Sequence, residues 1–445
     1  MRKFIFILLF TILATSMAFA QKDDGGIFPY DYTTETLDNG LKVILIPMPG
    51  NGIVSYYSIV RTGSRDEYEP GYSGFAHFFE HMMFRGTKKY PGRVYDSIMI
   101  SLGSNANAYT TDDYTCYHCN LIADDVERIM EIESDRFQNL FYDEQSFQTE
   151  AGAVYGEYLK TKTSPWFLVF EKISEVAFDK HTYKHTTMGF ETDIIAMPGM
   201  YEYSKKFFKR YYRPENIVLM VVGDFNPEDI SNKIHKYYGD WNTGYVGPKV
   251  EPEPEQTAER TAEIKYPGKT LPIVAIGYKG DAFDPADKSV AAAILLGNLA
   301  FGSNSELFKK LYIQEQKVQV FMPEFEYNRD PFLWFVFAQI KDKKDIGYVK
   351  EQIFSTIEHY RNNPPDAKKL EALKSHLKYD FLMNLDSPGN VAGSLARMVA
   401  LTGGIDAVDT YFKTLGQVTP EDIQAAAKKY FVPEKRTVVT LQGGK

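Results

Sequence analysis

A segment near the middle of the chain recurs near its end, and this repeat constrains the fold more than any other feature. Residues 211–223 read YYRPENIVLMVVG, and residues 430–443 read YFVPEKRTVVTLQG. Each copy follows a helical pattern and ends in a run rich in β-branched residues, which is typical of a strand. The second copy begins 219 residues after the first, at 430 against 211, so we expect a duplicated α+β domain.

The repeat and the chain length together predict two homologous α+β domains. A chain of 445 residues is too long for a single hydrophobic core. Residues 243–262 are rich in Pro, Glu and Gly and predict an exposed linker between domains at 28–242 and 263–445. We expect each domain to hold an antiparallel-rich sheet with packed helices, and the pair to close on a substrate as a clamshell.

Residues 1–20 predict a signal peptide. Arg2 and Lys3 precede an apolar run at 4–13, and the small-residue site AFA at 18–20 suits cleavage. The run is too short to span a bilayer comfortably, so we expect an exported, periplasmic or secreted chain. An uncleaved membrane anchor is the alternative.

The charge balance argues against a nucleic-acid partner. The whole chain carries a formal charge of -9, and removing residues 1–20, which hold two basic residues and no acid, makes it -11. An acidic chain is repelled by phosphate backbones. We therefore expect no nucleic acid and, after cleavage of the signal peptide, no membrane partner.

The two cysteines, Cys116 and Cys119, lie in a segment, residues 113–121, that predicts a strand. Residues three apart on a strand point to opposite faces, so the two thiols cannot share a metal. The chain has no second cysteine pair to complete a zinc site, and we expect a structural role.

The chemistry of the chain is concentrated in residues 71–87, which read GYSGFAHFFEHMMFRGT. On the helix expected at about 73–85, His77 and His81 share one face, and Glu80 stands beside them. Two neutral imidazoles and a carboxylate that can take a proton from water are what zinc-assisted hydrolysis requires. The order H-x-x-E-H inverts the H-E-x-x-H zinc peptidase motif. Surface histidines beside a glutamate are the alternative.

Two histidines leave a zinc site incomplete, so a third ligand must come from elsewhere in the chain. Residues 143–160 predict a helix that carries Glu150 and Glu157. Seven residues is close to two helical turns, so both carboxylates share a face. Two glutamates on a helix are, taken alone, more often solvated than bound to a metal.

The surroundings of the histidine motif form an extended signature. TLDNGLKV at 36–43 and GSRDE at 63–67 precede the motif, and RGT at 85–87 follows it. This signature resembles the pitrilysin/insulinase family of zinc peptidases, and in particular its short bacterial members similar to the mitochondrial processing peptidase. The resemblance covers nearly the whole chain after residue 30.

The resemblance implies a zinc metalloendopeptidase and assigns a role to each candidate residue. It places the metal ligands at His77, His81 and Glu157, with Glu80 as the catalytic general base. Glu150 matches a second acidic position, which would orient a ligand from behind. The expected cofactor is Zn²⁺, although the residues alone leave the choice of divalent ion open.

The segment NAYT at 107–110 matches an edge strand that, in the family, pairs with the substrate backbone. The resemblance therefore implies that Asn107, Ala108 and Tyr109 bind peptide substrates through main-chain hydrogen bonds. An ordinary turn into the next strand is the alternative.

The second half departs from the family pattern. The family's second domain contributes an arginine and, seven residues later, a tyrosine, which stabilise charge on the scissile carbonyl. Here those positions hold Tyr312 and Gln319. Because some relatives work as two different chains, the resemblance implies a zinc-bearing chain with a homologous partner that supplies the Arg/Tyr pair, or a homodimer.

We therefore expect a zinc-dependent endopeptidase that hydrolyses peptides or unfolded segments. The alternative is a non-catalytic peptide-binding or assembly subunit of the same fold. Loss of a ligand or of the base would mark such a subunit, and here all four residues are present.

Overall fold

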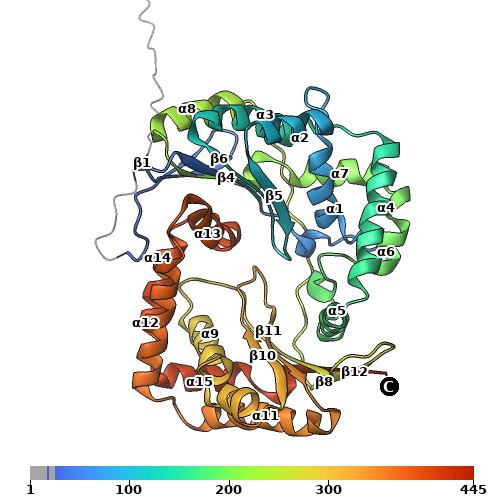
Figure 1. Cartoon of the computed structure of the whole chain (residues 1–445), viewed down its shortest axis with the longest axis vertical. Helices are drawn as coiled ribbons and strands as arrows, with labels where there is room; N and C mark the ends of the chain where they lie inside the picture. Colours follow the sequence, from blue (N-terminus) through green and yellow to red (C-terminus); the bar gives the residue numbers. More distant parts are fainter. Residues whose placement is uncertain (1–17, 20–25, 445) are drawn as a thin grey trace, which may run out of the picture.

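The computed structural model describes residues 18–19 and 26–444, and it contains two β-sheets, one built mainly from each half of the chain (Figure 1). The signal-peptide prediction therefore falls outside the described residues, apart from the two that form β1. The first sheet has the order β1-β2-β3-β7-β4-β6-β5. Its strands are β1 (Ala18–Phe19), β2 (Thr33–Thr36), β3 (Lys42–Pro47), β4 (Ile53–Val60), β5 (Asn105–Thr110), β6 (Thr115–Ile122) and β7 (Ile217–Gly223).

The second sheet has the order β10-β11-β9-β12-β8. Its strands are β8 (Arg260–Tyr266), β9 (Ile273–Lys279), β10 (Val318–Glu324), β11 (Leu333–Ile340) and β12 (Arg436–Gly443). Read from β8, this order reproduces β3-β7-β4-β6-β5 of the first sheet. In each sheet one pair is parallel, β3 with β7 and β8 with β12, and the other pairs are antiparallel. The predicted duplicated α+β fold is confirmed.

The repeated segments form the same structure twice. A short 3-10 helix with proline at its first position, η6 (Pro214–Asn216) or η9 (Pro433–Lys435), leads directly into β7 or β12. Proline suits the first helical position because its missing N–H has no partner there anyway. Both strands lie inside their sheets, with neighbours on both sides, which explains their apolar sequences.

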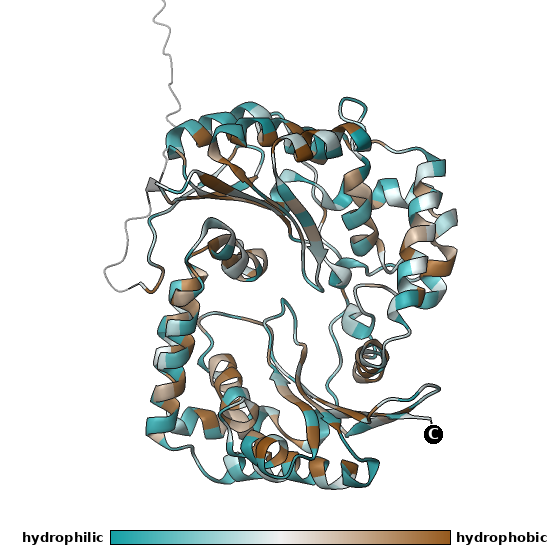
Figure 2. Ribbon diagram, in the orientation of Figure 1, coloured by the Kyte–Doolittle hydropathy of each residue, from teal (hydrophilic) through white to brown (hydrophobic). Residues whose placement is uncertain are grey.

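Helices from the same half cover one face of each sheet. The first sheet carries α1 (Phe75–Met82), α3 (Val126–Asn139), α7 (Tyr201–Tyr211) and α8 (Pro227–Tyr238). The second sheet carries α9 (Lys288–Phe301), α11 (Ile346–Asn362) and α15 (Pro420–Tyr430). Figure 2 shows inner strands of the first sheet in the colour of hydrophobic residues, as strands covered on both faces require, whereas the edge strand β5 is mostly in the hydrophilic colour.

The opposite face of each sheet is covered by a helix from the other half (Figure 1). Helix α13 (Pro388–Thr402) packs on β4 and β7, and its buried Leu395 belongs to the same hydrophobic cluster as Ile59 of β4 and Met220 of β7. In return, α5 (Pro165–Ala177) packs on β8, β9 and β12, and the ring of its Phe170 lies 4.8 Å from the ring of Phe337 on β11, centroid to centroid. We call this arrangement the helix exchange. It fastens the two halves of the chain to one another.

The segment between the halves is anchored along its length. Glu253 accepts hydrogen bonds from the backbone N–H groups of residues 179–181, at 2.8 to 3.1 Å. The buried Gln256 donates to the carbonyl of Arg436 at 2.9 Å. Strand β8 begins at Arg260, inside the expected linker range of 243–262, so the stretch without helix or strand ends at residue 259.

Cys116 and Cys119 lie on β6, are buried and unbonded, and face opposite sides of the first sheet, because they belong to different hydrophobic clusters. Within residues 26–444, no single helix is long and apolar enough to cross a membrane. The α13–α14 pair, with α14 at Ala407–Gly416, passes the same test together but bends by 92°.

Candidate metal centre

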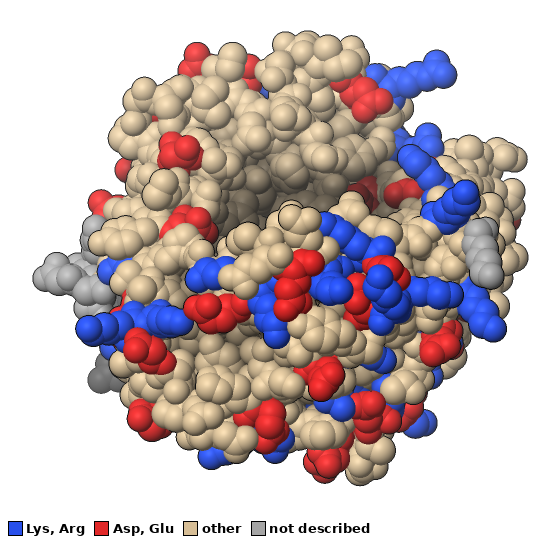
Figure 3. All heavy atoms as spheres, turned by 60° about the horizontal axis from the view of Figure 1, so that its bottom comes forward, with Lys and Arg blue, Asp and Glu red and all other residues tan. Residues whose placement is uncertain are grey.

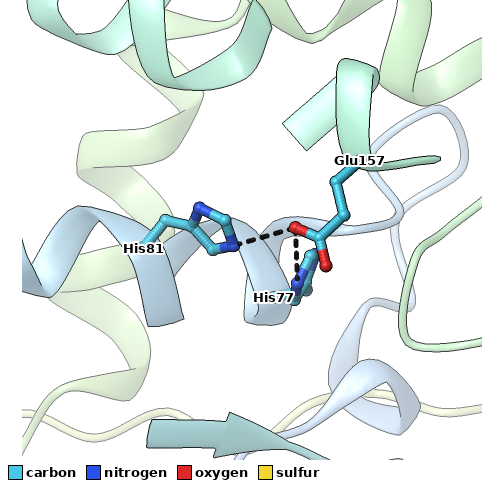
Figure 4. A group of neighbouring side chains, drawn as sticks. All are labelled: His77, His81 and Glu157. Atoms are coloured by element: carbon cyan, nitrogen blue, oxygen red, sulfur yellow. Dashed lines mark ion pairs between the residues drawn. The ribbon is translucent and has the colours of Figure 1, made fainter. Parts of the chain in front are cut away.

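Three side chains from two helices converge on one point beside the first sheet (Figure 4). His77 and His81 project from α1, and Glu157 reaches them from α4 (Glu144–Thr161). The Oε2 atom of Glu157 lies 3.3 Å from Nε2 of His81 and 3.8 Å from Nε2 of His77. All three potential ligand atoms lie within 4.8 Å of one another.

The start of α1 is set by Gly74 and Glu67. Gly74 adopts φ +88°, and a Cβ there would lie 2.3 Å from Ile194 Cδ1, so only glycine fits. The buried Glu67 carboxylate accepts the backbone N–H groups of Gly74 at 2.7 Å and Ala76 at 2.6 Å. These contacts fix the helix that carries the histidines.

The two faces of α1 differ in chemistry. Phe75, Phe78 and Phe79 are buried against the rest of the first half, which leaves His77, Glu80 and His81 on the face toward α4 and β5. The helix continues as η2 (Met83–Arg85) and stops at Gly86, where φ is +82°. Together α1 and η2 occupy the range in which the sequence predicts the motif helix.

Glu150, on the same helix as Glu157, lies behind His81. Its Oε1 atom is 2.9 Å from Nδ1 of His81, and its Oε2 atom accepts from Nε of Arg85 at 2.6 Å. Burial alone would raise the pKa of Glu150, but the hydrogen bonds from His81 and Arg85 outweigh it and lower the pKa. Glu150 therefore stays ionised and holds the proton of His81 on Nδ1, which leaves Nε2 free for a metal.

The electrostatics of the site keep His77 neutral. Burial lowers the pKa of His77 to about 4, and the neighbouring His81 adds to the effect. The hydrogen bond to Glu150 raises the pKa of His81. A neutral His77 is the form that binds metal ions.

The donor set and its spacing suit zinc. Ligands at about 2.0–2.2 Å from a tetrahedral zinc ion lie about 3.3–3.6 Å from one another. The separations of 3.3 and 3.8 Å from the Glu157 oxygen to the two imidazole nitrogens are close to that range. Two imidazoles and one carboxylate leave a fourth position open, as in catalytic rather than structural zinc sites.

Glu80 lies on the same face of α1, between the two histidines in sequence. Its Oε2 atom accepts a hydrogen bond from the hydroxyl of Thr110 at 2.7 Å. Burial raises the pKa of Glu80, and the hydrogen bond from Thr110 opposes that effect. Glu80 and His81 also line an open cavity of about 350 Å³ together with Phe84 and Asp96. A carboxylate with a raised pKa beside a metal group is a competent base.

Strand β5 is the free edge of the first sheet, and it leads to Glu80. The turn after it is closed by a hydrogen bond from Thr111 N–H to the Tyr114 carbonyl at 2.8 Å. In an antiparallel ladder bonded and non-bonded pairs alternate, so Asn107 and Tyr109 direct their main-chain groups to β6. Of the three residues expected to bind substrate, Ala108 alone directs its main-chain N–H and C=O groups away from β6, toward the free edge. Its N–H is held by the Asn107 side chain at 2.9 Å.

A second cavity lies between the two halves, next to the end of β5. It measures about 320 Å³ and is lined by aromatic residues, including Phe167 and Phe170 of α5 and Phe335 of β11, and by the acidic residues Asp112 and Glu324. Figure 3 shows a deep hollow in one face of the molecule, walled mainly by uncharged residues. The surface thus offers room for an extended chain.

The two positions at which the family would place arginine and tyrosine lie apart from these cavities. Tyr312 is on η7 (Lys309–Gln314), is exposed, and stacks on Phe308 with 4.8 Å between ring centroids. Gln319 sits at an irregularity in the pairing of β10 with β11. Neither residue lines the 320 Å³ or the 350 Å³ cavity.

The sequence signature contains Glu67 and Arg85, but it predicts no role for either residue. Glu67 caps α1, and Arg85 holds Glu150. Arg85, four residues after His81, could have been found from helical spacing, since both project toward the helix that carries Glu150. The spacing between Glu67 and the histidine motif gives no sign that the Glu67 side chain binds the start of α1.

The comparisons with known proteins agree with this geometry. Residues 42–191 match the family model described as insulinase (peptidase family M16), and residues 201–377 match the model described as the peptidase M16 inactive domain. The zinc protease PqqE of Helicobacter pylori is 28% identical over 413 residues, 92% of each chain. A crystal structure of a protease from Helicobacter pylori has a TM-score of 0.87 and 26% identity, covering 93% of this chain and 100% of that chain. A probable mitochondrial-processing peptidase subunit beta of Schizosaccharomyces pombe is 23% identical, covering 89% of this chain and 88% of that protein.

Proposed function

This chain belongs to the insulinase (M16) family of zinc proteases, and we propose that it hydrolyses peptides or unfolded segments as the zinc-bearing chain of a two-chain endopeptidase. The observation that carries the proposal is the convergence of His77, His81 and Glu157, with Glu80 beside them. The rival function, a non-catalytic peptide-binding or assembly subunit, would not need both a complete ligand set and a base.

In the proposed mechanism His77, His81 and Glu157 hold the zinc ion, and Glu150 orients His81 through its Nδ1 proton. Zinc, when bound there, lowers the pKa of a coordinated water and polarises the scissile carbonyl. Glu80 takes the proton of the attacking water and later delivers it to the leaving amine. The Thr110 hydroxyl occupies Oε2 of Glu80, so Oε1 is the atom that carries the proton.

The peptide would bind as an added strand along β5. The outward main-chain groups of Ala106 and Ala108 supply hydrogen bonds that do not depend on the substrate's side chains. The Asn107 side chain must leave the Ala108 N–H for this pairing to form. The cavities of about 350 and 320 Å³ then receive side chains on either side of the scissile bond.

A partner chain would complete the site. Tyr312 and Gln319 stand where the family's second domain offers arginine and tyrosine, and neither supplies a positive charge for the scissile carbonyl. The sequence predicts that the two domains of one chain close as a clamshell, but the helix exchange fastens these two halves to one another. We therefore propose that the enclosing shell forms between two chains rather than within one. The sequence of residues 1–20 supports export, to the periplasm or beyond.

The test is hydrolysis of a quenched fluorescent peptide library by the purified mature chain. Wild type is compared with a chelator-treated sample and with Glu80→Gln. Absence of cleavage, together with about one bound zinc per chain, supports the two-chain proposal, and activity should then appear on adding the homologous partner. Chelator-sensitive cleavage by the chain alone would contradict the need for a partner. Absence of both zinc and cleavage would favour the non-catalytic subunit.

A further inference from the structure

The carboxylate of Glu80 is held from the end of the edge strand. The Thr110 hydroxyl donates a hydrogen bond to its Oε2 atom at 2.7 Å. In the part of the chain that the structure describes, no other residue donates a hydrogen bond to this carboxylate. The direction in which Glu80 points therefore depends on where Thr110 is held.

The ladder geometry explains why the Thr110 N–H is available. Because Thr111 is bonded to Tyr114 across the turn, Thr110 and Thr115 form a non-bonded pair, and the Thr110 N–H points away from β6. Because the position lies on the free edge of the sheet, this N–H is not used by the ladder.

The turn that follows Thr110 is clamped by both halves of the chain. From the first half, Arg65 N–H donates to the Asp112 carbonyl at 2.8 Å. From the second half, the Asn328 side chain and the Arg329 N–H donate to the Asp113 carboxylate at 3.1 and 3.0 Å. Asp113 is 2% exposed, so these bonds are shielded from water. Thr110 cannot follow a movement of Glu80.

We infer that Thr110 is a positioning residue for Glu80, whose carboxylate it holds by one oxygen so that the other oxygen is left to take the proton. The inference rests on the proposed function for its catalytic consequence. Reactions of this kind lose rate steeply when the base is misaligned, because a free carboxylate samples several rotamers. Thr110 thus serves the base through its hydroxyl, and the second half supports catalysis through the turn.

The experiment compares Thr110→Val, which keeps the shape but removes the hydroxyl, with Thr110→Ser, which restores it. A matched control is Thr149→Val on α4, whose exposed hydroxyl bonds only to the Gln145 carbonyl. Each variant is assayed on a fluorogenic peptide with its partner chain present, and zinc content and thermal stability are measured in parallel.

We expect Thr110→Val to lower kcat about tenfold with KM and zinc content unchanged, since a hydrogen bond to a charged group is lost. Thr110→Ser should recover activity to within about threefold of wild type. Equal activity of Thr110→Val and wild type would overturn the inference, as would a Thr110→Ser variant no better than Thr110→Val.

Crystal structures of zinc-loaded wild type and Thr110→Val provide a readout that does not depend on activity. The inference expects the Glu80 side chain to leave its wild-type rotamer in Thr110→Val, and an unmoved Glu80 would overturn it. If wild type shows no chelator-sensitive cleavage with any partner, the proposed function fails, and the two structures still decide whether Thr110 positions Glu80.

Discussion

Replacing Glu150 with glutamine tests whether the carboxylate behind His81 tunes the metal centre. Glu150 is buried, with one oxygen 2.9 Å from Nδ1 of His81 and the other accepting from Arg85. Glutamine keeps the volume of the side chain but replaces one acceptor oxygen with an NH₂ group. That group must face a donor on either His81 or Arg85, so one of the two hydrogen bonds is lost.

The expected cost follows from this geometry. A hydrogen bond to a charged group contributes about 1.5–3 kcal/mol, and each 1.4 kcal/mol is a factor of ten in an equilibrium constant. We therefore expect Glu150→Gln to weaken zinc binding about 10- to 100-fold, the usual range for a group that orients a metal ligand. The fold should survive, since the substitution leaves no cavity.

The assay is a zinc competition titration against a fluorescent chelator at fixed pH, with thermal unfolding of the chelated protein as a check of folding. Glu144→Gln is the matched control, because Glu144 lies exposed in the first turn of the same helix, away from the metal group. A zinc Kd for Glu150→Gln within about twofold of wild type, in a folded protein, would refute the assigned role of Glu150.

Three further outcomes are expected. Glu80→Gln should lower kcat by about 10²- to 10⁴-fold while metal analysis still finds about one zinc per chain; retained kcat would exclude Glu80 as the base. The chelated protein should lose about 3 kcal/mol of stability through His77 between pH 6.5 and 4, because burial holds the folded pKa at about 4 and the unfolded chain takes the proton first. Urea unfolding of wild type and His77→Asn at pH 7 and pH 4 isolates the contribution of His77. Equal losses of unfolding free energy in the two proteins would contradict this prediction. Leu395→Ala, at a fully buried position of α13, should cost about 2–5 kcal/mol in one transition seen by both Trp241 and Trp334, whereas separate transitions would argue against interlocked halves.

The fold could be predicted from the sequence to the level of its repeat. The matching segments at 211–223 and 430–443 gave the duplication, because a buried central strand leaves a continuous apolar run that is easy to recognise. The helix exchange could not be predicted. The apolar residues of α13 indicate a buried helix, but nothing in a local pattern says which sheet will bury it.

The histidine pair could be predicted because its spacing is helical, whereas the choice of Glu157 as the third ligand depended on the family resemblance. His77 and His81 are four residues apart on one helix, and Glu150 and Glu157 are seven apart on another, so each pair shares a face. The contact between Glu80 and Thr110 could not be derived, since it joins residues 30 apart on a helix and a strand edge. Long-range contacts of this kind depend on tertiary packing, which periodicity does not encode.

The helix exchange also bears on how such a chain can be made and how it can have arisen. The inner face of the first sheet stays uncovered until synthesis reaches Thr402, the last residue of α13, so nearly the whole chain must exist before either half can hide its apolar surface. A half-length ancestor with the same architecture could bury that surface only by trading helices with a second copy of itself, as a domain-swapped dimer. Fusion of the two genes would have turned this exchange of helices between subunits into an exchange within one chain. The segment that ends at residue 259 would then be the connection between the two halves.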